Sequence, residues 1–542
     1  MAPRRSARVT SAKPLTAESK EATKKLPTKV AARPPRRRPA KRPAPVENET
    51  SSTLTRTKRR RTEPKAAANR DAPKAATQPK QVAAPQPAVA PFNPLPKAPT
   101  EHARPAPQLF GWGVGNFGQL GMGEDVLGEE YTKPTRNKIV EQKMQDGEFG
   151  GEDAGLEAVA AGGLFTLLLD EKGTVWSFGT NDDAALGRIT ANVPDPANKG
   201  KFLNVDTLTS EPYPIESLVK EDFRTVHIAA GDSIGAALDT QGDLRVWGSF
   251  RSVEGLLGFG EGSPHEFEPK KGDDILKLAN KPGDVEKVSS VVAGNNHLVV
   301  LTTHGDVYAW GAGEQGQLGR KVMERRKIRA TKPDKKIVLG SRTRRAVAIG
   351  AGNYTSFAVD ERGTLWGWGL NNMGQAGTGH ADPALDSEVV FPKKVIGLST
   401  DELGDDDKVV QISGGEHHTL FLTSSGKVYA CGRSDGGQLG LPDDHPALQE
   451  DTGMVPTPTL VPFPDEDDPV VNISAGIHNN LAVTRDGALY TWGTGPQSEL
   501  GAGDLSQVNT PQMIVRREGG SWAAVAASCG GQHSVALLRK RT

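Results

Sequence analysis

Polar side chains recur at one place in a short repeated element and are the first candidates for a functional site. The element reads Ala/Gly-Gly-x-x, often followed by histidine and an apolar run, as in GGEHHTLFL from Gly414. Its variable positions hold Asp232, Asn296 with His297, His418 and His533. Such side chains donate and accept hydrogen bonds, so a circle of them on one face would suit a binding surface. For any one histidine at this place, a structural hydrogen bond between neighbouring repeats is the favoured interpretation.

Covalent chemistry has little support in the sequence. The chain has no GxxxxGK[ST], HExxH or CxxC motif, so it lacks the usual signals for a phosphate-binding loop, a zinc peptidase and a redox dithiol. Its two cysteines, Cys431 and Cys529, exclude a disulfide scaffold and fit a reducing compartment. A sialidase-type site is disfavoured, because the repeats lack the arginine cluster and the Tyr/Glu pair that it needs. We therefore expect no metal, no cofactor and no enzymatic bond chemistry.

Two clusters of cationic side chains form a second set of candidates. Residues 1–107 hold 25 Lys and Arg against 7 Asp and Glu, a net charge of +18, and residues 320–345 hold 12 against 2, a net charge of +10. Charge of this density attracts polyanions such as nucleic-acid phosphates. The alternatives are that residues 320–345 form an ordinary solvated surface and that the basic runs of the tail arose by chance. The basic runs of the tail are centred on Arg36, Arg37, Arg38, Lys58, Arg59, Arg60 and Arg61.

The elements that must position these residues are set by a repeat. A Trp-Gly-like pair followed at a nearly constant distance by Leu-Gly, or by Ala-Gly in one copy, occurs seven times, at Gly111–Gly121, Ser177–Gly187, Trp247–Gly258, Ala309–Gly319, Gly367–Gly377, Ala430–Gly440 and Thr491–Gly501. Successive copies are 58 to 71 residues apart, a period that fits propeller blades with added loops. Each copy is followed by the Ala/Gly-Gly element and, in six cases, by a polar-Gly turn, which predicts a β-hairpin.

The seventh copy ends without its last strand, whereas Leu109–Gly113 begins with a strand that lacks a partner before it. We therefore predict an all-β fold, a seven-bladed β-propeller over residues 108–542, in which the first strand completes the last blade. Residues 1–107 are Pro- and Ala-rich with Phe92 as the one aromatic, so we predict a disordered basic tail. No apolar run approaches the ~18 residues that a membrane helix needs, and the first ten residues hold no apolar run, so we expect no secretion.

One loop of the ring breaks the regular spacing. From the glycine of the Trp-Gly pair to the leucine of the Leu-Gly pair, which is Ala376 in one copy, the distance is seven residues in six copies, but from Gly248 to Leu257 it is nine. The insertion predicts that Ser249–Leu256 projects beyond its neighbours. Random loop drift is the alternative interpretation.

The seven paired elements resemble the repeats of the regulator of chromosome condensation family, whose founding member is the exchange factor for the small GTPase Ran. The resemblance covers residues 108–540 and implies the propeller fold. It is less specific for function, because such repeats also occur in ubiquitin ligases, photoreceptors and scaffold proteins.

The resemblance also implies roles for individual residues. The projecting loop is similar to the wedge that the family's exchange factor inserts into Ran, here Phe250, Arg251, Ser252, Val253, Glu254, Gly255 and Leu256. Asp232, Asn296, His418, His533 and Arg320 match family contacts to Ran. Asn296 departs from the family, which has an aspartate there, so the charge at that place is lost. Arg188 follows Leu-Gly in another blade, so Arg320 can also be read as an ordinary surface arginine.

For the cationic clusters, the resemblance implies chromatin partners. Arg325, Arg326 and Arg329 would contact the acidic patch of the nucleosome. The tail would bind DNA and a nuclear import receptor, and Ala2-Pro3-Arg4 resembles the family's signal for α-amino methylation.

We therefore expect a nuclear, chromatin-associated guanine nucleotide exchange factor for Ran, with no membrane partner. Such a factor serves nucleocytoplasmic transport and the cell cycle. The alternative is a chromatin-binding propeller scaffold without exchange activity, which is favoured if Asn296 disables the site.

Overall fold

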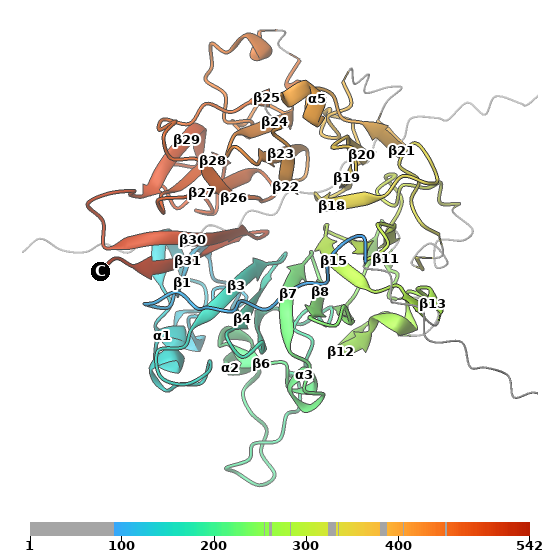
Figure 1. The fold of residues 1–542 in the computed structure, drawn as a ribbon. Coiled ribbons are helices and arrows are strands. Elements are labelled where there is room, and N and C mark those ends of the chain that lie inside the picture. Colours follow the sequence, from blue (N-terminus) through green and yellow to red (C-terminus); the bar gives the residue numbers. More distant parts are fainter. Residues whose placement is uncertain are drawn as a thin grey trace, which may run out of the picture. The chain divides into compact units, whose positions relative to one another are not determined.

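The structure, a computed structural model, describes residues 91–542 apart from residues 254, 260–262, 282, 324–331, 334, 380–386, 405 and 450–451. Apart from two small hairpins, the strands of these residues form seven antiparallel groups of three or four strands arranged around a central axis (Figure 1). A single parallel bridge, Ala351 to Ser413, links two of the sheets. The predicted seven-bladed β-propeller is confirmed.

We number the blades from the first complete sheet along the chain and count the strands of each blade from the axis outward. Blade 1 holds β3 (Leu156–Ala161), β4 (Phe165–Asp170), β5 (Val175–Gly179) and β6 (Tyr213–Pro214). Blade 2 holds β7 (Thr225–Ala230), β8 (Ile234–Asp239), β9 (Leu244–Gly248) and β12 (Glu266–Lys271). Blade 3 has three described strands, β15 (Val288–Ala293), β16 (His297–Thr302) and β17 (Val307–Gly311).

The later blades follow the same pattern. Blade 4 holds β18 (Ala346–Ala351), β19 (Thr355–Asp360), β20 (Leu365–Leu370) and β21 (Glu388–Lys394). Blade 5 holds β22 (Val409–Gly414), β23 (His418–Thr423), β24 (Val428–Arg433) and β25 (Met454–Leu460). Blade 6 holds β26 (Val470–Ala475), β27 (Asn479–Thr484), β28 (Leu489–Thr494) and β29 (Gln507–Val515).

Blade 7 closes the ring from both ends of the described chain. It contains β30 (Trp522–Cys529) and β31 (His533–Lys540), followed by β1 (Gln108–Val114) and β2 (Glu130–Arg136). Strand β1 pairs antiparallel with β31 from Gln108 opposite Leu538 to Gly113 opposite His533. This pairing removes the exposed sheet edges that an open array would have, as the sequence predicted.

Short elements lie in the connections between strands. The helices are α1 (Lys138–Gln145), α2 (Val205–Ser210), α3 (Glu216–Lys220) and α5 (Thr400–Leu403), with 3-10 turns η1 (Glu124–Val126), η2 (Gly272–Asp274) and η4 (Pro446–Leu448). Two small hairpins stand outside the blades, β10 (Arg251–Ser252) with β11 (Gly255–Leu256) and β13 (Asn280–Lys281) with β14 (Asp284–Val285). No described helix is long and apolar enough to cross a membrane.

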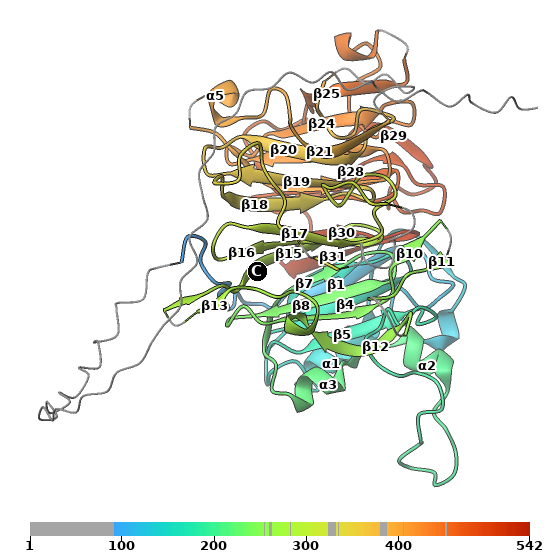
Figure 2. The ribbon, with the colours of Figure 1, turned by 90° about the vertical axis from the view of Figure 1, so that its right-hand side faces the viewer.

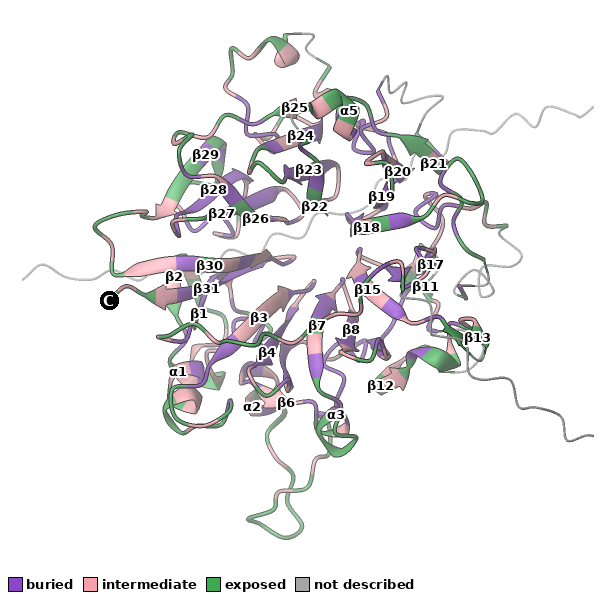
Figure 3. Ribbon diagram, in the orientation of Figure 1, coloured by how far each residue is buried: buried purple, intermediate pink, exposed green. Residues whose placement is uncertain are grey.

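The sequence repeat is explained by contacts between neighbouring blades. The Trp112 indole of blade 7 donates a hydrogen bond of 2.8 Å to the carbonyl of Glu499, which directly precedes the Leu-Gly pair of blade 6. Trp368 and Trp492 make the equivalent bond to Gln317 and Gln438. These tryptophans are fully buried. In Figure 3 the middle strands of the blades, such as β23 and β28, are mainly buried, whereas outer strands such as β12 and β21 are more exposed. Each of these Trp-Gly pairs therefore docks onto the Leu-Gly pair of the preceding blade, which is why the two motifs recur together.

The glycine of the Leu-Gly pair is required by the same contact. Gly501 has φ +65°, and a Cβ on it would lie 2.8 Å from the indole nitrogen of Trp112. A larger residue would be strained by its backbone conformation and would push the tryptophan out of its place.

Residues 91–107 form an extended segment that we call the strap, blue in Figure 1. The sequence assigned these residues to the disordered tail, but here they pack on blades 4, 3, 2 and 1. The Asn93 side chain is 5% exposed and donates to the carbonyls of Thr302 and Ala346, each at 3.0 Å, while its backbone N–H donates to Thr303. At the other end, the Arg104 guanidinium makes a two-bond contact with the Glu171 carboxylate.

Candidate functional site

The antiparallel order of the strands sorts the connections onto two faces of the ring. The turns from first to second strand and the loops from third to fourth strand lie on one face, which we call the upper face. The turns from second to third strand lie on the other, lower face, where the strap runs. Figure 2 views the ring from its edge and places β10 and β11 toward one face and β13 and α5 toward the other.

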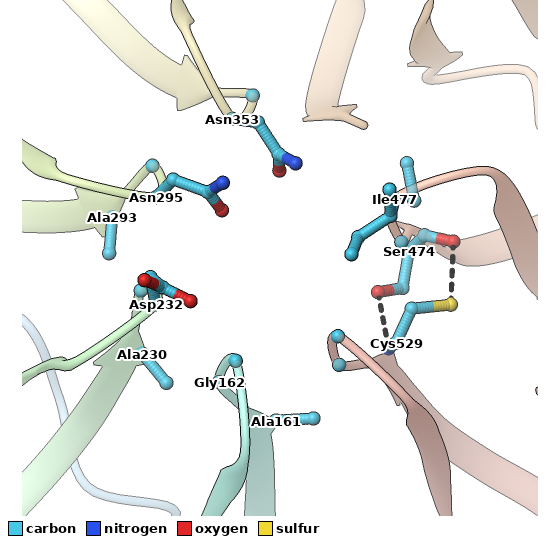
Figure 4. A pocket seen from close by; sticks show the side chains of 18 of the residues that line it. Ala161, Gly162, Ala230, Asp232, Ala293, Asn295, Asn353, Ser474, Ile477 and Cys529 are labelled. Carbon is cyan, nitrogen blue, oxygen red and sulfur yellow. Dashed lines mark hydrogen bonds between the residues drawn. The ribbon is translucent and has the colours of Figure 1, made fainter. Parts of the chain in front are cut away.

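The first-to-second turns place polar side chains around the central axis of the upper face. Asp232, Asn295 and Asn353 line a cavity of about 200 Å³ on the axis and point into it (Figure 4). Burial raises the pKa of Asp232, and the Arg251 guanidinium partly offsets this by favouring the charged carboxylate. Asp232 thus lies in the lining of the axial cavity on the upper face, and its contact with a partner stays a prediction.

The predicted histidines are not on this surface. His297, His418 and His533 are fully buried, and their Nε2 atoms lie 2.8 to 2.9 Å from Ser356 Oγ, Asn480 Oδ1 and Thr166 Oγ1 of the next blade. Burial lowers the pKa of His297 and His418 to about 4 and that of His533 to about 3, so all three are neutral near pH 7. For His418 and His533 the surface placement was wrong, and the structural alternative holds because both residues begin a buried second strand.

Sequence reasoning missed the residues that stand one or two places earlier in the same turns. Tyr354, Glu416, His417 and His478 are partly exposed on the upper face. The Glu416 carboxylate lies 3.9 Å from His417 Nε2 and 3.7 Å from His478 Nε2. A signal was available in the sequence: Phe165 and Ile234 occupy the histidine position in two other repeats, and a large apolar residue there indicates an inward-facing position.

The predicted projecting loop is a hairpin on the upper face of blade 2. Strands β10 and β11 pair Arg251 with Leu256 and Ser252 with Gly255. Val253 at the tip is 86% exposed, whereas Phe250 is completely buried and packs on Phe259 with ring centroids 4.7 Å apart. Phe250 therefore anchors the hairpin, and the projecting part begins at Arg251. Glu254 lies outside the described residues.

Both neighbouring blades contact the hairpin. The backbone N–H of Arg251 donates to Asn296 Oδ1 of blade 3 at 2.7 Å, and the N–H of Val253 donates to Glu314 Oε2 of blade 3 at 3.0 Å. The Arg251 guanidinium forms an ion pair with Asp183 of blade 1. Asn296 thus has a defined role as an acceptor at the base of the hairpin, and it performs this role without a charge.

A Gly-Asp-Ser-Ile-Gly sequence, Gly231–Gly235, matches the serine-nucleophile pattern in letters. Ser233 Oγ lies 3.5 Å from the Asp183 carboxylate, which also lies 3.4 Å from His265 Nε2. The aspartate stands between the serine and the histidine, so the histidine cannot take the serine proton as a general base. This cluster supports the hairpin rather than hydrolysis.

Arg320 is held by its own blade. Its guanidinium donates to the carbonyl of Ala309 at 2.8 Å and to that of Lys332 at 3.1 Å. Arg188, the equivalent residue of blade 1, is buried and bonds the carbonyls of Ser177 and Leu208. The shared geometry indicates that an arginine after Leu-Gly has a structural use, and contact of Arg320 with a partner stays a prediction.

The cationic insertion is described only in part, and Arg325, Arg326 and Arg329 lie outside the described residues. So do the tail residues Arg36, Arg37, Arg38, Lys58, Arg59, Arg60 and Arg61. Among the described cations, Arg344 and Arg345 pair with Asp360 and Glu361 of blade 4. Arg345 also lies over the ring of Phe92 in the strap, 3.8 Å from its centre.

Two features bear on covalent and metal chemistry. Burial raises the pKa of both cysteine thiols, that of Cys529 to about 12, so neither is a thiolate near neutral pH. His102, Glu157 and Glu171 form the one group of three potential metal ligands in the described part of the chain, and Arg104 already neutralises Glu171.

Comparison with known proteins gives one consistent result. A family model described as an RCC1-like domain matches residues 108–536. The guanine nucleotide exchange factor SRM1 of Saccharomyces cerevisiae is 32% identical, covering 79% of this chain and 86% of that protein. The regulator of chromosome condensation of Xenopus laevis is 32% identical, covering 81% and 92%.

A solved structure agrees. Prp20p of Saccharomyces cerevisiae, studied with its binding properties to Gsp1p and histones, superposes with a TM-score of 0.68 at 30% identity, covering 81% of this chain and 93% of that one.

Proposed function

Because the chain belongs to the family of RCC1-like domains, we propose that it is a guanine nucleotide exchange factor for the small GTPase Ran. The observation that carries the proposal is the β10–β11 hairpin, which stands on the upper face and presents Val253 to solvent. The exchange activity in the name of the related SRM1 and the Gsp1p binding of Prp20p support the same assignment.

The mechanism is displacement of the nucleotide and forms no covalent bond. The hairpin inserts where the GTPase holds its nucleotide, while Asp232, Glu416 and His417 around the axis supply polar contacts to the same partner. The chain then binds nucleotide-free Ran more tightly than loaded Ran, and by linkage it lowers the nucleotide affinity of Ran by the same factor. The ratio of GDP to GTP that rebinds is set by their concentrations in solution.

The cationic segments hold this activity on chromatin. The tail binds DNA phosphates and a nuclear import receptor, and Arg325, Arg326 and Arg329 bind the acidic patch of the nucleosome. Histone binding by Prp20p supports a nuclear, chromatin-associated protein. The position of the strap supports separate faces for chromatin and for the GTPase. The strap begins on the lower face beside Arg345 and does not cover the upper face.

The proposal is tested by mixing a catalytic amount of the purified chain with Ran loaded with fluorescent GDP and excess unlabelled nucleotide. We expect release to accelerate with Ran and to stay at the intrinsic rate with a Ras-type GTPase as control. Unchanged release from Ran, with nucleosome binding retained, would favour the chromatin-binding scaffold without exchange activity.

A further inference from the structure

Hairpin β10–β11 is too small to hold its own shape. Each strand has two residues, joined by one turn. Even longer isolated two-stranded hairpins are marginal in water, because the backbone entropy lost on ordering exceeds what so few contacts return. The pose of the projecting residues must therefore depend on groups outside the hairpin.

Three such groups surround it, and they come from the two flanking blades. Asp183 in the third-to-fourth loop of blade 1 pairs with the Arg251 guanidinium, and Asn296 in blade 3 accepts the Arg251 N–H at 2.7 Å. Glu314, in the third-to-fourth loop of blade 3, accepts the N–H of Val253 at the tip at 3.0 Å. Below them, buried Phe250 receives a hydrogen bond on its carbonyl from Leu257, which closes the loop.

We propose that Asp183 and Glu314 are positioning residues for nucleotide exchange, which hold the hairpin from two sides in the one pose that can enter the GTPase. This inference rests on the proposed function. Asp183 is buried, and His265 Nε2 lies 3.4 Å from its carboxylate, which fixes the carboxylate in turn. Glu314 acts on the backbone of Val253, so the Val253 side chain stays exposed for the partner.

Preorganisation is the physical reason that such residues matter. A hairpin that samples many poses must be ordered when it binds, and the ordering cost is subtracted from the free energy that expels the nucleotide. The rest of the upper face still docks. Loss of the clamp should therefore lower the maximal release rate more than it raises the Ran concentration at half-maximal rate.

The test compares Glu314→Ala with Glu314→Gln, which keeps an oxygen acceptor for the Val253 N–H, and adds Asp183→Ala. Glu361→Ala is the matched control, since it removes an exposed paired carboxylate on the lower face. Two quantities are measured on each folded variant: amide hydrogen exchange of residues 250–257 in the free chain, and GDP release from Ran at saturating Ran concentration.

We expect Glu314→Ala and Asp183→Ala each to raise amide hydrogen exchange in the hairpin and to lower the maximal rate of GDP release about tenfold. A tenfold change in rate corresponds to the free energy of one hydrogen bond to a charged group. Glu314→Gln and the control should stay near wild type. Unchanged hairpin exchange in both alanine variants would overturn the clamp while leaving the proposed function intact. A glutamine variant as slow as the alanine variant would show direct contact with Ran instead of positioning. Raised exchange with unchanged release would overturn the inference and count against the hairpin as the wedge itself.

Discussion

At the scale of single residues, the same histidine that marks the repeat in the sequence serves the fold and not the surface. His297, His418 and His533 bridge neighbouring blades through Nε2 and are neutral because burial lowers the pKa of each imidazole. In the unfolded chain the same groups titrate near pH 6.5. Their contribution to stability is therefore full above that pH and declines as the pH falls toward the folded-state pKa values of about 4 and 3.

Acid should consequently destabilise the ring over the range from about pH 6.5 to 4, by up to about 1.4 kcal/mol per pH unit for each buried histidine. His533→Gln removes one of these proton-binding groups from the unfolded state, so its free energy of unfolding should fall less steeply with acid. Urea midpoints measured between pH 7 and 4.5 check this. Curves of equal slope for the variant and the wild type would show that His533 does not take up a proton on unfolding.

Asn296 lends itself to a sharper test, because the structure gives its side chain a defined partner. Asn296→Asp keeps an oxygen that accepts the Arg251 N–H, so nucleotide release from Ran should hold or rise. Asn296→Ala removes the acceptor and should slow release several-fold. If the aspartate variant instead releases nucleotide more slowly than the wild type, exchange by this chain requires an uncharged side chain at position 296.

At the scale of elements, the blades could be predicted from the sequence and the strap could not. Trp112, Trp368 and Trp492 each contact the Leu-Gly pair of the preceding blade. Because the same contact is made in several blades, both motifs recur at regular intervals in the sequence. The strap is held by Asn93 through backbone carbonyls more than 200 residues away, and a carbonyl has no sequence signature. In the same way, the turn residues were found by pattern, but which of them face outward depended on the phase of the following strand.

Because of the strap, we expect two truncated chains to differ in melting temperature. Removing residues 1–90 should leave the melting temperature unchanged, whereas removing residues 1–107 should lower it by about 2–5 °C, because buried carbonyls lose their donors. Asn93→Ala in the full chain is the matched point change. Removing a further dozen residues deletes β1 and should unfold or aggregate the ring, since blade 7 then loses the strand between β31 and β2. Equal melting temperatures for all three truncations would contradict both the strap and the ring closure.

At the scale of the whole molecule, the ring keeps two surfaces apart, so that two partners need not compete for the same surface. The hairpin and the polar circle occupy the upper face, and the strap with Arg344 and Arg345 occupies the lower face or its edge. Under the proposed function, a chain anchored through its cationic segments would keep its exchange surface accessible. The acidic charge of the ring, −18 over residues 108–542, also disfavours wrapping of the ring itself by DNA.

Replacing Arg325, Arg326 and Arg329 by alanine should therefore weaken nucleosome binding on the order of tenfold, while GDP release from Ran in solution stays near the wild-type rate. The two activities are compared by nucleosome titration and by the release assay on the same preparation. A parallel loss of both would mean that the insertion serves the upper face or the fold.

The central claim is that the β10–β11 hairpin expels the nucleotide, and GDP release from Ran by a hairpin-swapped chain tests it most directly. Phe250 is kept, because it belongs to the core, and residues 251–256 are replaced by the four residues Glu314–Gln317, which occupy the equivalent place in the regular loop of blade 3 and restore the seven-residue spacing. The ring tolerates that spacing in six blades, so the melting temperature should be preserved. We expect release to fall to the intrinsic rate of Ran while the swapped chain still binds nucleosomes. A swapped chain that accelerates GDP release from Ran to the wild-type rate would contradict the account and favour the chromatin-binding scaffold without exchange activity.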